Sequence, residues 1–217
     1  MINKLLFSIS TLGLAILLPA AFASPLSNNT ASTDVDINAS GFTGTQVADT
    51  GALPFATSRN VNGTLDQQVY RESGGTLDFY YLITNNASSI DNIGRMTTID
   101  FTGFTTAVSY LIITNGIPPS GADRSPSGDT VGFDFKDRSG NNTLAPGASS
   151  DWLEIATNAN AFTTGQTFVI DGGTGSVQTY APTATPEPMS MSLLGVGLAG
   201  SALLGLRRRY ASNSSLS

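Results

Sequence analysis

The side chains that could do chemistry in this chain are carboxylates, hydroxyls, amides and aromatic rings, because its 217 residues include no histidine and no cysteine. This composition excludes disulfide bonds, zinc sites of the usual Cys/His type, and catalytic arrangements of the Ser-His-Asp or Cys-His kind. Whatever the protein does would therefore have to use carboxylates, hydroxyls, amides and aromatic rings.

The nearest conspicuous carboxylates are Asp151 and Glu154, on either side of Trp152. Two carboxyl groups facing one bond are typical of glycoside hydrolysis. In a strand, however, an offset of three residues sends two side chains to opposite faces, so a working pair would have to be assembled across strands or loops. Trp152, Tyr80 and Tyr180 could stack on sugar rings, although ordinary cross-strand packing is the commoner role of aromatic residues in strands.

Two acidic groups raise the question of calcium. The first, Asp34-Val35-Asp36-Ile37-Asn38, begins like a calcium-binding loop, but Ala39 stands where such a loop needs glycine and Thr45 where it needs a bidentate glutamate. The second comprises Asp129, Asp134 and Asp137. Solvated acidic edges and loops are the favoured interpretation, with calcium in another geometry as the alternative, so we expect no metal and no cofactor.

The elements that would position these residues are strands. Residues 76–84, TLDFYYLIT, place Leu77, Phe79, Tyr81 and Ile83 on one face at a period of two, and Asp78, Tyr80 and Thr84 on the other. Seven similar short stretches are predicted as strands, at residues 65–72, 97–101, 107–113, 130–135, 152–157, 167–170 and 177–180.

Turn-rich pieces such as Ser73-Gly74-Gly75 and Asp171-Gly172-Gly173 separate these stretches. About eight short strands without an amphipathic helix predict an all-β fold, an antiparallel β-sandwich over residues 45–180. Residues 24–44 are small and polar, which predicts a flexible lead-in with at most a short edge strand. Residues 181–185, APTAT, are predicted to be an extended linker.

The charge of the body points away from anionic partners. Between residues 24 and 185 there are one lysine and five arginines against fifteen acids, a net charge of −9. Such a surface repels phosphate backbones and anionic headgroups. We therefore expect no binding of nucleic acid.

The N-terminus has the pattern of a secretory signal peptide. Lys4 precedes an apolar run at residues 5–18, and Ala21 and Ala23 supply the small residues that a signal peptidase reads. A permanent N-terminal membrane anchor is disfavoured because the run is short for a span and Pro19 interrupts its end. Residues 1–23 are therefore predicted to be removed on export.

A second apolar segment lies near the C-terminus. Residues 189–206 contain no charged side chain and would measure about 27 Å as a helix, close to the roughly 30 Å hydrocarbon core of a bilayer. Arg207, Arg208 and Arg209 follow directly, and clustered positive charges beside a span stay on the cytoplasmic side. The predicted topology therefore has the body outside and the arginines inside.

Pro186-Glu187-Pro188, the apolar helix and the arginine cluster together resemble the PEP-CTERM sorting tail of exported proteins of Gram-negative bacteria that make extracellular polysaccharide. The resemblance covers residues 186–209, followed by a short extension at residues 210–217. It implies a membrane-embedded exosortase that recognises the tail, removes the span and passes the body to the cell surface or matrix. The body, with VYRESGGTLDFYYLITN at residues 69–85, also resembles uncharacterised extracellular domains that carry such tails.

The sequence therefore predicts a non-enzymatic structural protein of the surface or extracellular matrix, associated with exopolysaccharide and biofilm. The expected partners are signal peptidase, the exosortase and, transiently, the inner membrane. The alternative is a carbohydrate-binding or carbohydrate-processing module that acts on the extracellular polysaccharide.

Overall fold

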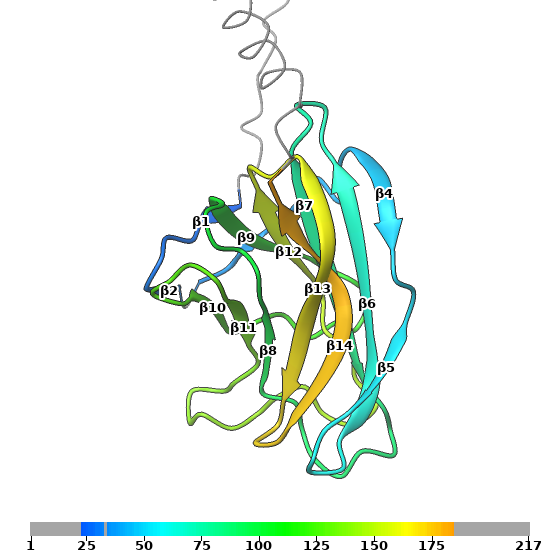
Figure 1. Ribbon diagram of the computed structural model, residues 1–217. Coiled ribbons are helices and arrows are strands. Elements are labelled where there is room, and N and C mark those ends of the chain that lie inside the picture. The colour runs from blue at the N-terminus through cyan, green and yellow to red at the C-terminus, as the bar shows by residue number, and fades with distance from the viewer. Residues whose placement is uncertain (1–22, 33, 185–217) are drawn as a thin grey trace, which may run out of the picture.

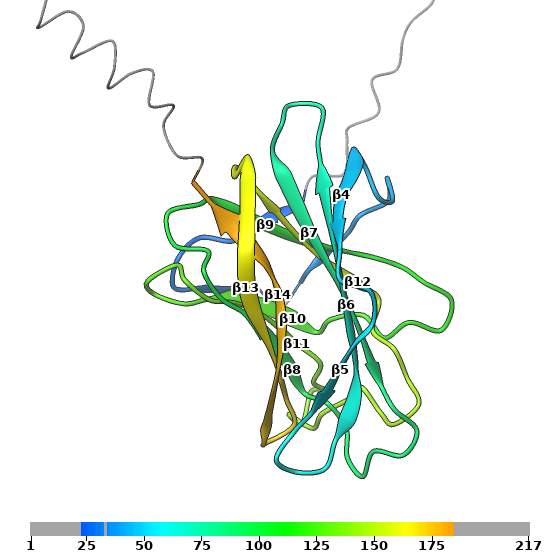
Figure 2. The same ribbon diagram turned by 45° about the vertical axis from the view of Figure 1, so that its right-hand side comes forward.

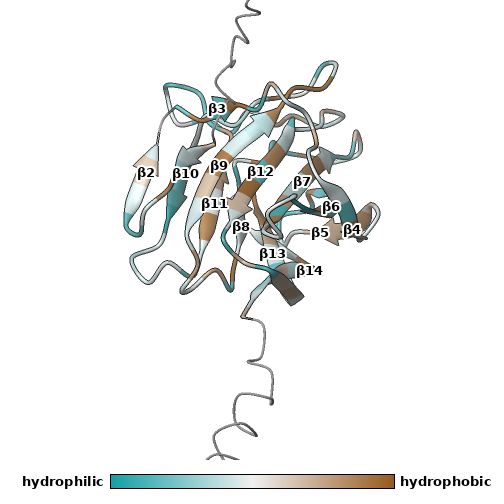
Figure 3. Cartoon of the chain, turned by 90° about the horizontal axis from the view of Figure 1, so that it is seen from above, coloured by the Kyte–Doolittle hydropathy of each residue, from teal (hydrophilic) through white to brown (hydrophobic). Residues whose placement is uncertain are grey.

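The computed structural model describes residues 23–32 and 34–184, and these fold into a sandwich of two β-sheets (Figure 1). No helix occurs among them, and so none that is long and apolar enough to cross a membrane. The all-β, antiparallel sandwich expected from the sequence is confirmed for this part of the chain. Seen from above, the two sheets form separate layers (Figure 3).

The first sheet has eight strands. Its order is β1-β9-β12-β7-β6-β4, with β3 also paired to β9 and β5 to β6. All pairings are antiparallel except the two-residue contact of β3 with β9. The strands are β1 (Ser24–Pro25), β3 (Asp36–Ile37), β4 (Thr45–Asp49), β5 (Leu53–Ala56), β6 (Asn62–Arg71), β7 (Leu77–Asn85), β9 (Thr106–Leu111) and β12 (Trp152–Thr157).

The second sheet has six strands in the order β14-β13-β8-β11-β10-β2, all antiparallel. The strands are β2 (Thr30–Ser32), β8 (Arg95–Thr98), β10 (Gly121–Arg124), β11 (Val131–Asp134), β13 (Ala161–Ile170) and β14 (Thr174–Thr183). The long β13–β14 hairpin dominates one side of the molecule (Figure 2). Its turn uses Gly172 at a φ of 100°, a conformation that favours glycine.

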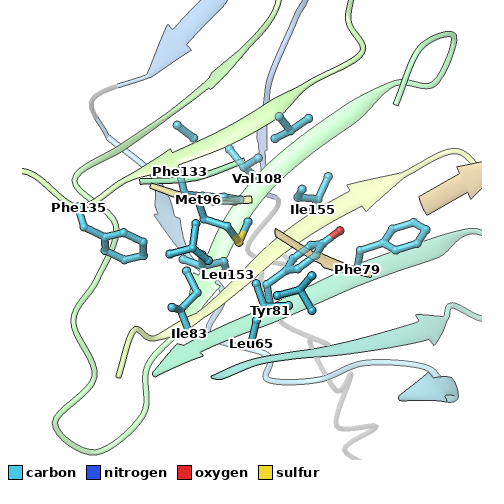
Figure 4. Close-up of a cluster of buried hydrophobic side chains, with 14 of the residues drawn as sticks. Leu65, Phe79, Tyr81, Ile83, Met96, Val108, Phe133, Phe135, Leu153 and Ile155 are labelled. Carbon is cyan, nitrogen blue, oxygen red and sulfur yellow. The ribbon is translucent and has the colours of Figure 1, made fainter. Parts of the chain in front are cut away.

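The core lies between the sheets and is built from alternating residues of both. Leu77, Phe79, Tyr81 and Ile83 of β7 are completely buried, which confirms the predicted inward face of this strand. Figure 4 shows the side chains of β7 meeting Met96 and Phe133 of the second sheet. Phe79 also contacts Phe101 edge-to-face, with ring centroids 5.8 Å apart.

The expectation of a flexible lead-in at residues 24–44 is wrong where the structure describes it. β1 and β3 both pair with β9, and β2 pairs with β10, so this segment supplies edge strands to both sheets. Leu26 and Val35 are buried and anchor it to the core. The polar composition led to the wrong prediction because an edge strand is held mainly by backbone hydrogen bonds. Most of its side chains can therefore be polar and exposed.

The predicted linker also begins too early, because β14 continues through Ala181 and Pro182 to Thr183. Pro182 is tolerated since β14 is an edge strand, where a missing N–H breaks no ladder. Gln67 of the first sheet holds this edge: its amide nitrogen donates to the Tyr180 carbonyl at 2.8 Å, and its amide oxygen accepts from the Tyr180 N–H at 2.5 Å. The side chain of Gln67 thus takes the place of a neighbouring strand and links the two sheets.

The described part of the chain begins next to β1 and ends with β14, and these two chain ends lie at the same end of the molecule (Figure 1). Phe104 lines two neighbouring hollows, one with Pro25 and Leu26, the other with Pro182 and Thr183. Arg124 is buried there, and its guanidinium donates to carbonyl oxygens of four residues, namely Leu26, Phe101, Phe104 and Gly128. The neighbouring backbone carbonyls thereby compensate for the burial of this cation.

Candidate functional site

A group of buried acids lies on the outer face of the first sheet, on the side away from the core. Glu154 of β12 stands between Tyr80 of β7 and Ser109 of β9 in the ladder. Its Oε1 accepts from the Tyr80 hydroxyl at 2.9 Å, and its Oε2 accepts from the Asn38 amide at 2.8 Å and from the Ser109 hydroxyl. Glu154 is 4% exposed, so its carboxylate is both buried and fully hydrogen-bonded.

Asp78 is the second buried acid of this face, one position along the outer row of β7 from Tyr80. Burial and, after it, the negative charges of Glu154 and Glu72 together raise the pKa of Asp78 to about 7. Burial, and the carboxylate of Glu154, likewise raise the pKa of the Tyr80 phenol.

The segment between β3 and β4 covers these acids. Asn38 bonds Glu154 at its start, and the Thr43 hydroxyl donates to Glu72 at 2.7 Å near its end. Between them, Phe42 packs on three rings: it is stacked on Tyr70 at 5.2 Å and meets Tyr80 and Trp152 edge-to-face at 4.9 and 5.4 Å. We call residues 38–44 the covering segment.

The covering segment corrects one expectation from the sequence. Tyr80 was expected on an exposed face, and it does point away from the core, yet it is completely buried under Phe42. Trp152 is half-buried and already pairs with Phe42. The aromatic rings of Tyr80 and Trp152, which were expected to be available for stacking on sugars, therefore pack at least in part against Phe42 over the buried acids.

The structure does not bring Asp151 and Glu154 together as a pair. Asp151 precedes β12, is 2% exposed, and accepts a hydrogen bond from the backbone N–H of Ile113 at 2.8 Å, so it fixes a loop. The neighbour of Glu154 is Asp78 instead. A donor or substrate could reach this pair only if the covering segment moved, since both carboxyl groups are more than nine-tenths buried.

The acidic groups considered for calcium are separated in the structure. In the first group, Asp36 accepts from the Ser24 hydroxyl at 2.5 Å while Asn38 serves Glu154. In the second, Asp134 pairs with Arg95 at 2.9 Å, which also pairs with Asp123. Asp129 accepts from Thr102, and Asp137 closes its own loop through Asn141. Over residues 23–32 and 34–184, no group of three or more acids is placed to hold a metal ion.

A polar groove lies between the first sheet and the β13–β14 hairpin. In this part of the sandwich β14 approaches β5 and β6. The volume of the groove is about 300 Å³, and Asp49 and Leu53 line it from the first sheet. Thr164, Gln178 and Tyr180 line it from the β13–β14 hairpin. Tyr180 was expected on an exposed strand face; it is half-buried, packs edge-to-face on Phe162 at 5.2 Å, and borders this groove.

The sorting residues Pro186, Glu187, Pro188, Arg207, Arg208 and Arg209 lie outside the described residues, as does Ala21 of the signal peptide. Ala23 is described and stands directly before β1. Nothing in the geometry above therefore depends on the tail.

No family model, no curated protein and no solved structure matches this chain. The function must therefore be argued from the residues and their arrangement.

Sequence reasoning missed Asp78, Asn38 and the polar groove. The sequence pattern could have pointed to Asp78, because an acid near Tyr80 on the polar face of a strand is a candidate member of a buried hydrogen-bond network. Its pairing with Glu154 depends on the register of β7 against β12, and residues 78 and 154 are too far apart in sequence for a local pattern to reveal it.

Proposed function

We propose that this chain is a non-enzymatic structural protein of the cell surface or extracellular matrix, exported through its signal peptide and sorted by a PEP-CTERM tail. The observation that carries the proposal is the order of features at the C-terminus: Pro186-Glu187-Pro188, eighteen residues without a charge, then three arginines. The body between the two apolar segments is a sandwich that folds around its own core.

The position of the sandwich supports this proposal. β14 ends at Thr183, so only Ala184 and Thr185 separate the last strand from Pro186. Residues in extended conformation span at most about 3.6 Å each, which keeps the motif within roughly 10 Å of a strand end held by Gln67. A rigid body at the outer end of a membrane span leaves the motif itself as the accessible stretch for a processing enzyme.

The state of the acids supports a role without catalysis. Glu154 accepts three hydrogen bonds, Asp78 lies against Glu154 and Glu72, and both buried acids lie beneath the covering segment. A general acid or base has to be within hydrogen-bond reach of the group it serves. In this arrangement the acids instead bind the covering segment to the first sheet.

Processing in the native host tests the proposal. Pro186→Ala and Glu187→Ala should leave full-length precursor in the inner membrane, because a span inserts almost irreversibly and release needs cleavage. Deleting the exosortase should have the same effect. Thr185→Ala, outside the motif, is the matched control and should be processed like the wild type. Normal processing of both motif variants would refute recognition of the tail.

The second candidate is binding of extracellular polysaccharide, and the polar groove favours it. The groove combines a carboxylate, a hydroxyl, an amide and an aromatic ring within one opening. Sites for small polar ligands are built from such convergent polar groups on an apolar floor.

A further inference from the structure

The polar groove contains hydrogen-bonding groups that the protein does not use itself. Thr164 and Gln178 are exposed, and within residues 23–32 and 34–184 their side chains form no hydrogen bond. A hydroxyl both donates and accepts, and a primary amide offers two donors and an acceptor. These two side chains can therefore satisfy neighbouring hydroxyl groups of a ligand.

The scaffold holds these groups in fixed positions. Gln178 and Thr164 belong to paired strands, with Gln178 opposite Gln166 and Thr164 opposite Tyr180. The backbone of Tyr180 is held by two hydrogen bonds with the side chain of Gln67, one donated by the Gln67 amide nitrogen and one accepted by its amide oxygen. Because the ligand would meet a preformed surface, little conformational entropy would be lost in ordering the site.

The other side of the groove supplies an acceptor and an apolar wall. Both oxygens of Asp49 accept hydrogen bonds, from the Gly51 N–H at 2.6 Å and from the Gln46 amide at 2.9 Å, and each oxygen can accept another. Leu53 provides apolar surface on this side, and the ring of Tyr180 provides it on the side of the hairpin. These groups complement a sugar ring, which carries hydroxyl groups around its rim and C–H groups on its faces.

The charge of the groove restricts the ligand further. Burial raises the pKa of Asp66, and the negative charge of its neighbour Asp49 raises it further. Among the residues that line the groove there is no lysine or arginine to offset the charge of Asp49. A uronic acid or a phosphorylated sugar would place a like charge beside Asp49, which disfavours its binding.

We propose that the groove formed by Asp49, Leu53, Thr164, Gln178 and Tyr180 binds an uncharged sugar unit of a polysaccharide chain. This inference rests on the second candidate function and names the site and the ligand class. The groove has a volume of about 300 Å³, which is at the small end of the range for ligand sites. Such a volume suits a single sugar unit of a longer polysaccharide chain.

Calorimetric titration of the full-length protein in detergent tests the site without depending on tail processing. The probes are hexasaccharides of glucose, mannose and galactose, each compared with hexasaccharides of guluronic and mannuronic acid. At least one neutral probe should bind and the acidic probes should not. Thr164→Ala and Gln178→Ala should each weaken binding by roughly three- to tenfold, the effect of losing one or two hydrogen bonds.

Two exposed residues of the same hairpin that do not line the groove, Gln166 and Ser176, provide matched controls. Gln166→Ala and Ser176→Ala should leave affinity unchanged, and Asp49→Asn should raise affinity for the acidic probes. Equal losses from Gln166→Ala and Gln178→Ala, or loss only on Phe42→Ala, would place the site elsewhere while leaving polysaccharide binding intact. If no neutral probe binds at millimolar concentration, both the groove and the second candidate function fail, and the processing of the tail is unaffected.

Discussion

Asp78 is a carboxyl group placed where a carboxylate is costly. It is 6% exposed and lies against Glu154 and Glu72, so burial and like charge both favour its protonated form. In its protonated form Asp78 can donate a hydrogen bond to the neighbouring Glu72, which in turn accepts one from Thr43 of the covering segment. The proton on Asp78 thus helps to fix a covering segment that reaches Glu154 at its other end.

This arrangement makes stability depend on pH. The pKa of Asp78 is about 7 in the folded protein against 3.8 for the free group, so between these values the folded state binds more protons. The contribution is therefore complete below pH 4 and is lost as the pH rises toward 7. Denaturant unfolding at pH 4, 5.5 and 7 should show that Asp78→Asn gains stability relative to the wild type as the pH rises.

Asp137 provides a matched control in an exposed loop. Hydrogen bonds from the side chain and backbone of Asn141 lower its pKa, so its contribution is lost only as the pH falls through the acid range. Asp137→Asn should therefore keep a constant difference from the wild type between pH 5.5 and 7. If the Asp78→Asn curve also ran parallel to the wild type, the shifted pKa of Asp78 would be disproved.

At the scale of elements, the central strands were readable from the sequence because one face of each is apolar. Each of the eight predicted stretches overlaps a strand: β12 has the expected bounds, β13 begins earlier than expected, and β14 is longer at both ends. The alternation of apolar and polar residues in β7 can be recognised in the sequence because its inward residues are all large and apolar. Hydrophobic periodicity thus identifies strands that contribute side chains to the core.

The missed elements lack that signal. β5 carries Pro54 at a position where an edge strand allows it, and β10 reads Gly-Ala-Asp-Arg with only two weakly apolar residues. β1, β2 and β3 are held by backbone pairing along sheet edges. The acid network was missed for a related reason, because the pairing of β7 with β12 is a tertiary contact.

The register of β7 yields a test at this scale. Phe79→Ala should cost about 3 to 5 kcal/mol of unfolding free energy, because it empties a completely buried site against Phe101. Thr84→Ala, on the outer face, loses one hydrogen bond to Ser149 and should cost about 1 kcal/mol or less. Urea unfolding of the two variants measures both, and similar midpoints would show that the register is wrong.

At the scale of the whole molecule, the two ends of the sandwich meet around Phe104 and Arg124. Ser24, the first residue expected after signal removal, is paired with Val108, and Thr183 closes β14 at the same end. If the chain is sorted as proposed, this end of the sandwich faces the membrane before processing. Processing at the two ends would then release an intact sandwich.

The mass of the mature protein tests the central claim most directly. The form isolated from the cell surface or culture medium of the native host is digested and analysed by mass spectrometry. We predict an N-terminal peptide that begins at Ser24 and no peptide from residues 189–206, because the signal peptide and the span are both removed. A mature species that still contains residues 189–206 would contradict the proposed sorting and processing.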